Sequence, residues 1–537
     1  DLVDLLTGYF YVNVHTDAQP DGEVRGQVGG AALLAATLAG AHEVPPVETD
    51  ALGRVVAALE ADARTFSLRA HVTGLPQVQA AHIHRAPAGQ NGGVIFDLLA
   101  DGGMLNSATP LTYTTQFTLG QALEMVAGNY YVNAHTTAFA GGEVRGQLMR
   151  LTPPSHLHAG LIGGEEVPAV TTDAAGIARL RVHPVLGQLA YRIDVTDIDN
   201  VEMAHIHRAE RGSNGPVFVN FDLQPGELTS AAPVAGVKTL SGADWVDILS
   251  GNAYVNVHTQ ANAGGEIRGQ VTTATPFSTT LSGAAEVPPV TTMASGLAVI
   301  ALRGDTAALD YRVTVATIDG VSAAHIHTGV AGVNGDVVRD LNGATLTPTT
   351  PIAGSVDADN SLIFDLLRGR NYVNVHTAEN PGGEIRGQLA QAVVPTEYAV
   401  ALTPGAEIAP ASAAQTDPSG EAILALDPVA GVLLYTLRVM NLDEIVAAHI
   451  HRGAVTENGP VVYGLYEGET AFDAENPIAG AIQLGSRDLV DLLTEFFYIN
   501  VHTTSQPSGA IRGQVTLDSQ EEMMPNLFVP QLDRGDE

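Results

Sequence analysis

Histidine pairs of the form His-x-His recur along the chain, and each is followed by a third histidine 51 to 53 residues after its first member. The pairs stand in four Ala-His-Ile-His segments, and the third histidine stands in an Asn-Val-His or Asn-Ala-His segment. Neutral imidazole suits Zn(II) and Cu(II), and three imidazoles form a familiar site with one open coordination position. The candidate metal ligands are His82, His84, His135, His205, His207, His258, His325, His327, His376, His449, His451 and His502, with His15 as a further copy of the third histidine.

Alternation of side chains along a strand explains how such segments would present their imidazoles. Residues two apart on a strand project from the same face, so His82 and His84 point together and Ile83 points to the other side. Tyr131, Asn133 and His135 share a face in the same way. If the two faces meet, three imidazoles converge on one ion. The alternative interpretation is a set of histidines held by backbone or carboxylate hydrogen bonds, without metal.

The choice of metal follows from the available ligands. The chain has no cysteine, which excludes thiolate sites and a blue-copper centre. Copper binds nitrogen ligands more tightly than zinc at equal availability, so copper is the first choice and zinc the second, with one ion per complete copy.

The histidine motifs are the clearest part of a longer repeat. The third histidines lie 118 to 126 residues apart, which is the size of a small domain. We expect complete domains at residues 29–150, 151–272, 273–391 and 392–516, followed by a tail at 517–537. Residues 1–28 read almost like residues 488–515, so they represent the C-terminal part of an incomplete domain. Either upstream residues or a second chain would complete this domain.

Each copy reads as a series of short strands. A leading strand runs into a Glu-Val-Pro turn, and strands with alternating apolar residues follow, such as Leu189 to Val195. An Asn-Gly pair after each His-x-His strand predicts a tight turn with positive φ. One short helix is expected before the last hairpin, as at Ala243 to Leu249. The predicted fold is all-β: a tandem array of antiparallel Greek-key β-sandwich or barrel domains, each with one short helix.

Composition limits the possible partners. The chain of 537 residues has 25 basic and 59 acidic residues, for a formal net charge of −34. This balance argues against binding to nucleic acid or to anionic membrane surfaces, and no stretch is long and apolar enough to span a membrane. It fits an extracellular or cell-surface setting. No serine-histidine-acid set or phosphate loop supports a hydrolase.

Other recurring or isolated residues have simpler interpretations. A recurring arginine lies on the strand that follows the strand of the third histidine: Arg25, Arg145, Arg268, Arg386 and Arg512. It either holds loop carbonyls or a glutamate, or stands beside the metal and guides an anion to it. His156 and His158 are interpreted as an exposed strand start. His42, His71 and His183 have no counterparts and are read as surface or hydrogen-bonded core residues.

Four segments carry a resemblance to a known family. The patterns G-x-x-E-V-P-P, A-H-I-H-x-x-x-x-G-x-N-G, Y-V-N-V-H-T and G-G-E-I-R-G-Q resemble the CHRD (chordin-type) domain over four whole copies and one partial copy. The resemblance implies a β-sandwich-like fold and an extracellular setting. The histidine set is also similar to the copper site of copper/zinc superoxide dismutase, but the bridging histidine and the zinc loop have no counterpart here.

Three functions remain open from the sequence. The first is an extracellular structural protein that forms a filament, coat or matrix by self-association, in which the three-histidine sites hold metal. Multiple copies of one site suit multivalency or capacity. The second is a copper oxidoreductase with dismutase-like activity, which would depend on the arginine and the open coordination position. The third is a protein-binding module without metal.

Overall fold

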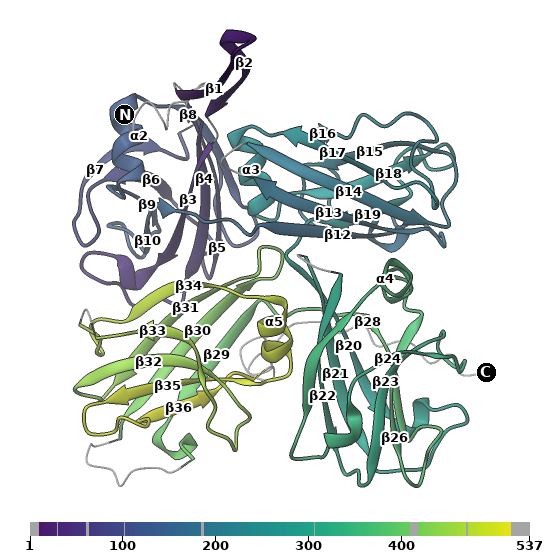
Figure 1. The fold of residues 1–537 in the computed structure, drawn as a ribbon. Coiled ribbons are helices and arrows are strands. Elements are labelled where there is room, and N and C mark those ends of the chain that lie inside the picture. The colour runs from purple at the N-terminus through teal and green to yellow at the C-terminus, as the bar shows by residue number, and fades with distance from the viewer. Residues whose placement is uncertain are drawn as a thin grey trace. The chain divides into compact units, whose positions relative to one another are not determined.

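The computed structural model describes residues 10–28, 31–60, 64–100, 102–183, 187–304, 307–408, 417–468 and 471–516. Antiparallel strands dominate these residues, and the four α-helices have eight residues each (Figure 1). This arrangement confirms the predicted all-β array with one short helix in each complete copy. None of the helices in the described ranges is long and apolar enough to cross a membrane.

The chain divides into two compact units. One unit contains Asp1–Val394 with Asp427–Leu434 and Ala479–Thr494, and the other contains Pro395–Leu426, Tyr435–Ile478 and Glu495–Glu537. The first unit therefore holds the first three complete copies and the helix of the fourth copy.

The second copy illustrates the topology. Its eight strands follow the order β16-β15-β18-β19-β12-β13-β14-β17. The two halves of this sheet join where β12 meets β19, at the single pair Ile162 and Arg268. The elements are β12 (His156–Ile162), β13 (Ala175–His183), β14 (Gln188–Thr196), β15 (Val201–His207), β16 (Val217–Asn220), β17 (Val234–Thr239), α3 (Gly242–Leu249), β18 (Tyr254–Thr259) and β19 (Ile267–Gln270).

The first and third copies repeat this order, each with a small additional strand. The first comprises β3 (Ala31–Ala39), β4 (Leu52–Glu60), β5 (Thr65–Thr73), β6 (Ala80–Arg85), β7 (Gly93–Asp97), β8 (Leu111–Gln116), α2 (Leu119–Val126), β9 (Tyr130–His135), β10 (Val144–Gln147) and β11 (Met149–Arg150). The third comprises β20 (Ala274–Ser282), β21 (Ser295–Arg303), β22 (Ala308–Ala316), β23 (Val321–Thr328), β24 (Val337–Asp340), β25 (Ile352–Asp357), α4 (Asn360–Leu367), β26 (Asn371–Thr377), β27 (Ile385–Gln388) and β28 (Ala390–Gln391).

In the fourth copy the same strands form two four-stranded sheets, β29-β30-β31-β34 and β33-β32-β35-β36. Its elements are β29 (Glu397–Leu402), β30 (Ser419–Asp427), β31 (Val432–Met440), β32 (Ile445–Arg452), β33 (Val461–Tyr466), β34 (Ile478–Gln483), α5 (Ser486–Leu493), β35 (Phe497–Thr503) and β36 (Ile511–Gln514). Short 3₁₀ turns occur at Gly40–His42, Gly163–Glu165, Gly283–Ala285, Gly343–Thr345 and Pro404–Ala406.

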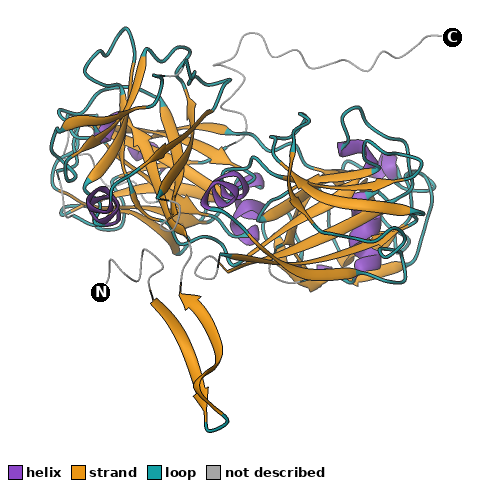
Figure 2. Ribbon diagram, turned by 90° about the horizontal axis from the view of Figure 1, so that it is seen from above, coloured by secondary structure: helices purple, strands orange, loops and turns teal. Residues whose placement is uncertain are grey.

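The partial copy at the start contributes one hairpin, β1 (Phe10–Thr16) and β2 (Gln19–Val28). The two strands pair only with each other among the described strands, and they form a two-stranded ribbon (Figure 2). The sequence similarity to residues 488–515 places this hairpin at the position of β35 and β36 in a complete copy.

Strand β4 is apolar on both of its faces. Val55 and Ala57 belong to the core of the first copy, whereas Val56 and Ala58 belong to the buried cluster of the second copy together with Trp245. Helix α3 reaches this surface because it packs on β4 and β5. A side chain at Gly242 would place its Cβ 3.1 Å from the Cβ of Ala58, so the helix approaches the strand closely. The helix of the second copy thus buries the outer face of a strand in the first copy.

Two sequence-based expectations were wrong. Neither residue of the Asn-Gly pairs has positive φ; instead, a Cβ at Gly92 would lie 2.0 Å from the carbonyl oxygen of Arg85, so glycine is required by close packing. His158 is not exposed: its side chain is fully buried and bonds to Thr275 Oγ1 at 2.8 Å. The His156–Ile162 strand is covered because it runs through the middle of its sheet.

Candidate metal centre

The His-x-His strand and the strand of the third histidine are neighbours in one sheet. Strand β6 pairs with β9 so that His82 lies opposite Asn133, and Ala80 lies opposite His135. Ile83 and Ala134 point into the core, as expected from strand alternation. The imidazoles therefore meet across adjacent strands, rather than across two facing sheets.

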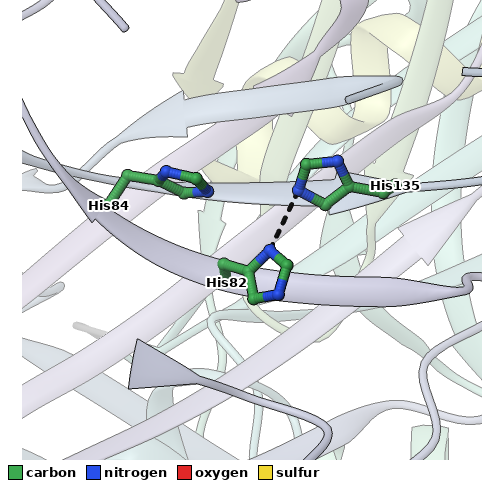
Figure 3. A group of neighbouring side chains, drawn as sticks. All are labelled: His82, His84 and His135. Carbon is green, nitrogen blue, oxygen red and sulfur yellow. Dashed lines mark hydrogen bonds between the residues drawn. The ribbon is translucent and has the colours of Figure 1, made fainter. Parts of the chain in front are cut away.

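In the first copy the three imidazoles are turned toward one another (Figure 3). His82 Nδ1 lies 3.1 Å from His135 Nε2, and the ring centroids of His82 and His84 are 5.6 Å apart. The candidate ligand atoms of a cluster all lie within 4.8 Å of one another. The structure assembles all four predicted trios: His82, His84 and His135; His205, His207 and His258; His325, His327 and His376; and His449, His451 and His502.

Backbone carbonyls orient two of the three rings in every copy. In the second copy, His207 Nδ1 lies 2.9 Å from the carbonyl oxygen of Gly215, and His258 Nδ1 lies 3.1 Å from that of Ala263. A carbonyl only accepts, so each Nδ1 carries the proton and each Nε2 keeps its lone pair. A hydrogen bond to the opposite ring nitrogen is the usual way in which proteins orient a metal-binding histidine.

The nitrogens that face one another have no other partner. In the second copy these are His205 Nδ1, His207 Nε2 and His258 Nε2, and all three are buried without a hydrogen bond. The third and fourth copies leave the equivalent atoms unpaired: His325 Nδ1, His327 Nε2, His376 Nε2, His449 Nδ1, His451 Nε2 and His502 Nε2. Buried polar atoms are normally bonded, so three lone pairs aimed at one point fit a metal ion.

In the second copy, burial keeps the three rings neutral. It lowers the pKa of His205 to about 4, with His258 and His207 adding to the effect. The pKa of His207 and that of His258 are also lowered, mainly by burial. A metal binds the deprotonated ring, so this environment provides the protonation state that coordination requires.

Each second histidine of a pair lies against a stack of a tyrosine and the recurring arginine. In the first copy the His84 and Tyr131 rings are stacked with centroids 4.8 Å apart, and the guanidinium of Arg145 lies 3.4 Å from the Tyr131 centroid. The tyrosine ring thus separates the arginine from the histidine. The same stack forms with Tyr254 and Arg268, Tyr372 and Arg386, and Tyr498 and Arg512.

The arginine holds the loop that follows the His-x-His strand. Arg145 donates from Nη2 to the carbonyl oxygen of Gln90 at 2.7 Å and from Nη1 to Asn91 Oδ1 at 3.0 Å. Asn91 in turn donates to the carbonyl oxygen of Val44. These contacts favour the loop-holding role over anion guidance. The loop carries Gly92, whose carbonyl oxygen lies 2.9 Å from His84 Nδ1.

Sequence reasoning missed a buried carboxyl beside this arginine. Glu43 is 6 % exposed, and burial raises its pKa to about 7 although the nearby Arg145 opposes the shift. Its Oε1 and Asn133 Oδ1 have no hydrogen-bond partner. The recurrence of Glu before Val-Pro could have revealed it. The glutamate two residues before the arginine, Glu143, instead accepts from Thr136.

The remaining predicted ligand, His15, lies exposed on β1. Its Nδ1 is 2.8 Å from the carbonyl oxygen of Pro20. This contact resembles those of His135 and His258, so the ring has the orientation of a third histidine. Among the residues that the structure describes, His15 belongs to none of the four clusters.

Comparison with known proteins agrees with the repeat seen in the structure. The sequence model of the CHRD domain matches residues 1–28, 34–148, 157–271, 277–389 and 398–515. Chordin from Xenopus laevis is 27 % identical over 255 residues, which are 43 % of this chain and 26 % of chordin. The chain thus matches about a quarter of that relative's length. Tandem CHRD domains point to a secreted or extracellular protein-interaction module. With five matches that together cover most of its length, the chain belongs to the CHRD domain family.

Proposed function

We propose that this protein is an extracellular structural repeat protein in which each of the four complete copies binds one metal ion through its three histidines. Copper is the first choice and zinc the second. The structural role is a filament, coat or matrix component formed by self-association. The short connections between copies and the net charge of −34 support a soluble, repetitive surface of this kind.

One observation carries the metal proposal. In repeated clusters, the histidine nitrogens that face one another have no hydrogen-bond partner, while the opposite ring nitrogen of two histidines in each cluster donates to a backbone carbonyl. A hydrogen-bonded histidine cluster would instead pair these atoms with one another or with the backbone. Among the four described clusters, only that of the first copy has such a contact, between His82 Nδ1 and His135 Nε2. Tetrahedral coordination at about 2.0–2.1 Å needs ligand nitrogens roughly 3.3 Å apart, which small ring movements achieve from separations within 4.8 Å.

The geometry gives little support to a redox enzyme. A dismutase-like reaction would benefit from a cation beside the open coordination position, but Arg145 lies behind the ring of Tyr131 and is engaged by the loop. Four equivalent sites suit capacity or cross-linking better than turnover. A direct dismutase assay of the copper-loaded protein, with Arg268→Ala for comparison, tests this alternative; activity that depends on Arg268 would favour the enzyme.

Metal analysis of the purified full chain tests the proposal. After loading with copper or zinc and removal of excess, we expect four ions per chain by elemental measurement. The double variant His205→Ala and His207→Ala should hold three. The matched control is His156→Ala with His183→Ala, which removes two histidines outside the clusters and should leave four.

Two results would contradict the metal assignment. One is a metal content that is unaffected by the His205 and His207 substitutions in folded protein. The other is folded protein with no metal at saturating copper or zinc, which would favour the metal-free binding module. Self-association is tested separately by sedimentation of the loaded and chelated protein; a monomer under both conditions, up to high protein concentration, would argue against a polymer.

A further inference from the structure

Three junctions between copies use the same pair of surfaces. In the first unit, helix α3 packs on β4 and β5, α4 packs on β13, and α5 packs on β21 and β22. In each case the helix of one copy covers the outer face of the leading sheet of the copy before it. The leading sheet is the half formed by the first three strands of a copy and its sixth strand, such as β12, β13, β14 and β17.

The first residue of each helix contacts the preceding copy. Gly242 lies against Ala58. Asn360 Oδ1 accepts from Arg179 Nη2 at 2.6 Å, and Ser486 donates to Asp310. The junction between the third and fourth copies also contains a buried ion pair. In it, Arg312 Nη2 lies 2.6 Å from Asp491.

Helix α2 has the same position in its copy but a different environment. Its first residue, Leu119, is 39 % exposed, although the corresponding Gly242 is buried. Met125, Ala122 and Val126 pack in the core of the first copy, whose cluster does not include Leu119 or Leu123. Leu119 and Leu123 are one turn apart on one side of the helix, and we call them the α2 face. The principal contact of α2 is β11 of its own copy.

We propose that the α2 face docks onto the outer face of the leading sheet of a preceding CHRD unit, namely the unit whose last hairpin is β1–β2. That hairpin matches the end of the CHRD domain, and it directly precedes the copy that carries α2. The three described junctions supply the geometry. This inference is independent of metal binding.

The expected partner surface has small apolar side chains with a polar border. The outer face of β21 is an example, since Val299 and Ala301 are buried beneath α5. Glu124 stands at the helix position of Asp491 and forms an ion pair with Arg85 of its own copy, so the border of the α2 face is charged. Leu119 replaces the glycine, asparagine or serine of the other helices, so the first turn of α2 adds an apolar side chain to this face.

The test adds a leading sheet of this kind to the full chain. Residues 274–361 of the third copy are duplicated ahead of Asp1, which completes the unit because residue 1 corresponds to Leu362. The chain has no cysteine, so Leu119→Cys provides a single thiol on the α2 face. We expect its labelling rate to fall at least tenfold in the extended chain. Val237→Cys, at a position 56 % exposed on β17, serves as the control and should react equally in both chains.

Hydrogen exchange of β1 and β2 shows whether the added unit has folded. Protection of this hairpin without protection of Leu119→Cys would overturn the proposal. A labelling rate that falls with protein concentration in the unextended chain, together with dimers in sedimentation, would also overturn it, because a second copy of the chain would then occupy the α2 face.

A second measurement does not depend on the added unit. Because Leu119 is 39 % exposed and lies outside the described core cluster of its own copy, Leu119→Asp in the unextended chain should leave the hydrogen-exchange protection of β4 and β9 unchanged within a factor of about three. The matched change at a residue that does belong to the core, Met125→Asp, should abolish protection in these strands. A large loss of protection in Leu119→Asp would show that the face serves the first copy itself, and would refute the inference.

Discussion

The substitution Ala58→Asp places a carboxyl group in the junction between the first and second copies. Ala58 is fully buried on the outer face of β4, opposite Gly242 of helix α3. The same buried cluster contains Trp245, the single tryptophan of the chain. Tryptophan fluorescence therefore reports on this junction without any label.

The cost of the substitution at pH 7 can be estimated from the pKa of aspartate. A carboxyl group kept neutral at pH 7 costs about 4 kcal/mol, because its ordinary pKa is about 3.9 and each unit corresponds to about 1.4 kcal/mol. An unsatisfied polar group adds roughly 1–3 kcal/mol. Asparagine has almost the same size and shape as aspartate. The Ala58→Asn variant therefore also buries an unsatisfied polar group, but it does not have the cost of keeping a carboxyl group neutral. The Asp and Asn variants should thus differ by about 4 kcal/mol at pH 7 and by almost nothing at pH 4.

Burial raises the pKa of the new carboxyl group, so docking of α3 is weakened as the pH rises above about 4 and is restored as the pH falls. At pH 7 we expect Trp245 emission of the Asp variant to shift to longer wavelength and become accessible to acrylamide. At pH 4 it should match that of the Asn variant.

Two controls show whether the fluorescence change is specific to a carboxyl group at position 58. Unsubstituted protein is measured at both pH values, and Ala235→Asp places the same group on an exposed position of β17, where no change is expected. Equal emission of the Asp and Asn variants at pH 7, in folded protein, would refute the conclusion that α3 closes over a dry surface at Ala58.

Other predictions follow from single buried groups. Burial lowers the pKa of His158 to about 4, so the local stability of β12 should fall by roughly 3 kcal/mol between pH 7 and pH 4, and His158→Gln should remove most of this dependence in hydrogen exchange. Gly92→Ala should displace the loop that holds His84 and lower metal affinity in the first copy about 10- to 100-fold, whereas Gly93→Ala, with open space around its Cβ, should not. Asp491→Ala leaves Arg312 buried without this carboxylate and should destabilise that junction by about 3–5 kcal/mol in denaturant unfolding; a loss below 1 kcal/mol would contradict this.

Much of the fold could be predicted because its signals are local. Alternation around His82 and His84 indicates which residues share a face, and the recurrence of the third histidine indicates that they meet. The position of the short helix follows from apolar spacing in segments such as Gly242–Leu249. The convergence of each trio in the structure agrees with these patterns, and binding of metal remains the proposal to be tested.

The missed features depend on contacts between distant segments. The role of Gly92 arises from its approach to the Arg85 carbonyl, and the burial of His158 arises from strands on both sides of it. The helix junction had one local signal. Val55-Val56-Ala57-Ala58-Leu59 is apolar without alternation, which is typical of a strand covered on both faces. What covers the second face cannot be read from that run.

The helix-on-sheet junction has a consequence for how such arrays evolve. Because every copy offers one helix and one outer sheet surface, a gene duplication that inserts a whole copy preserves the general docking geometry. The order of the copies is nevertheless constrained, since Gly242 suits Ala58 whereas Asp491 suits Arg312. Recombination that changes the order of the copies would bury mismatched charges at the junctions. Duplication followed by divergence at each junction therefore yields an array whose copies are similar in fold but fixed in order.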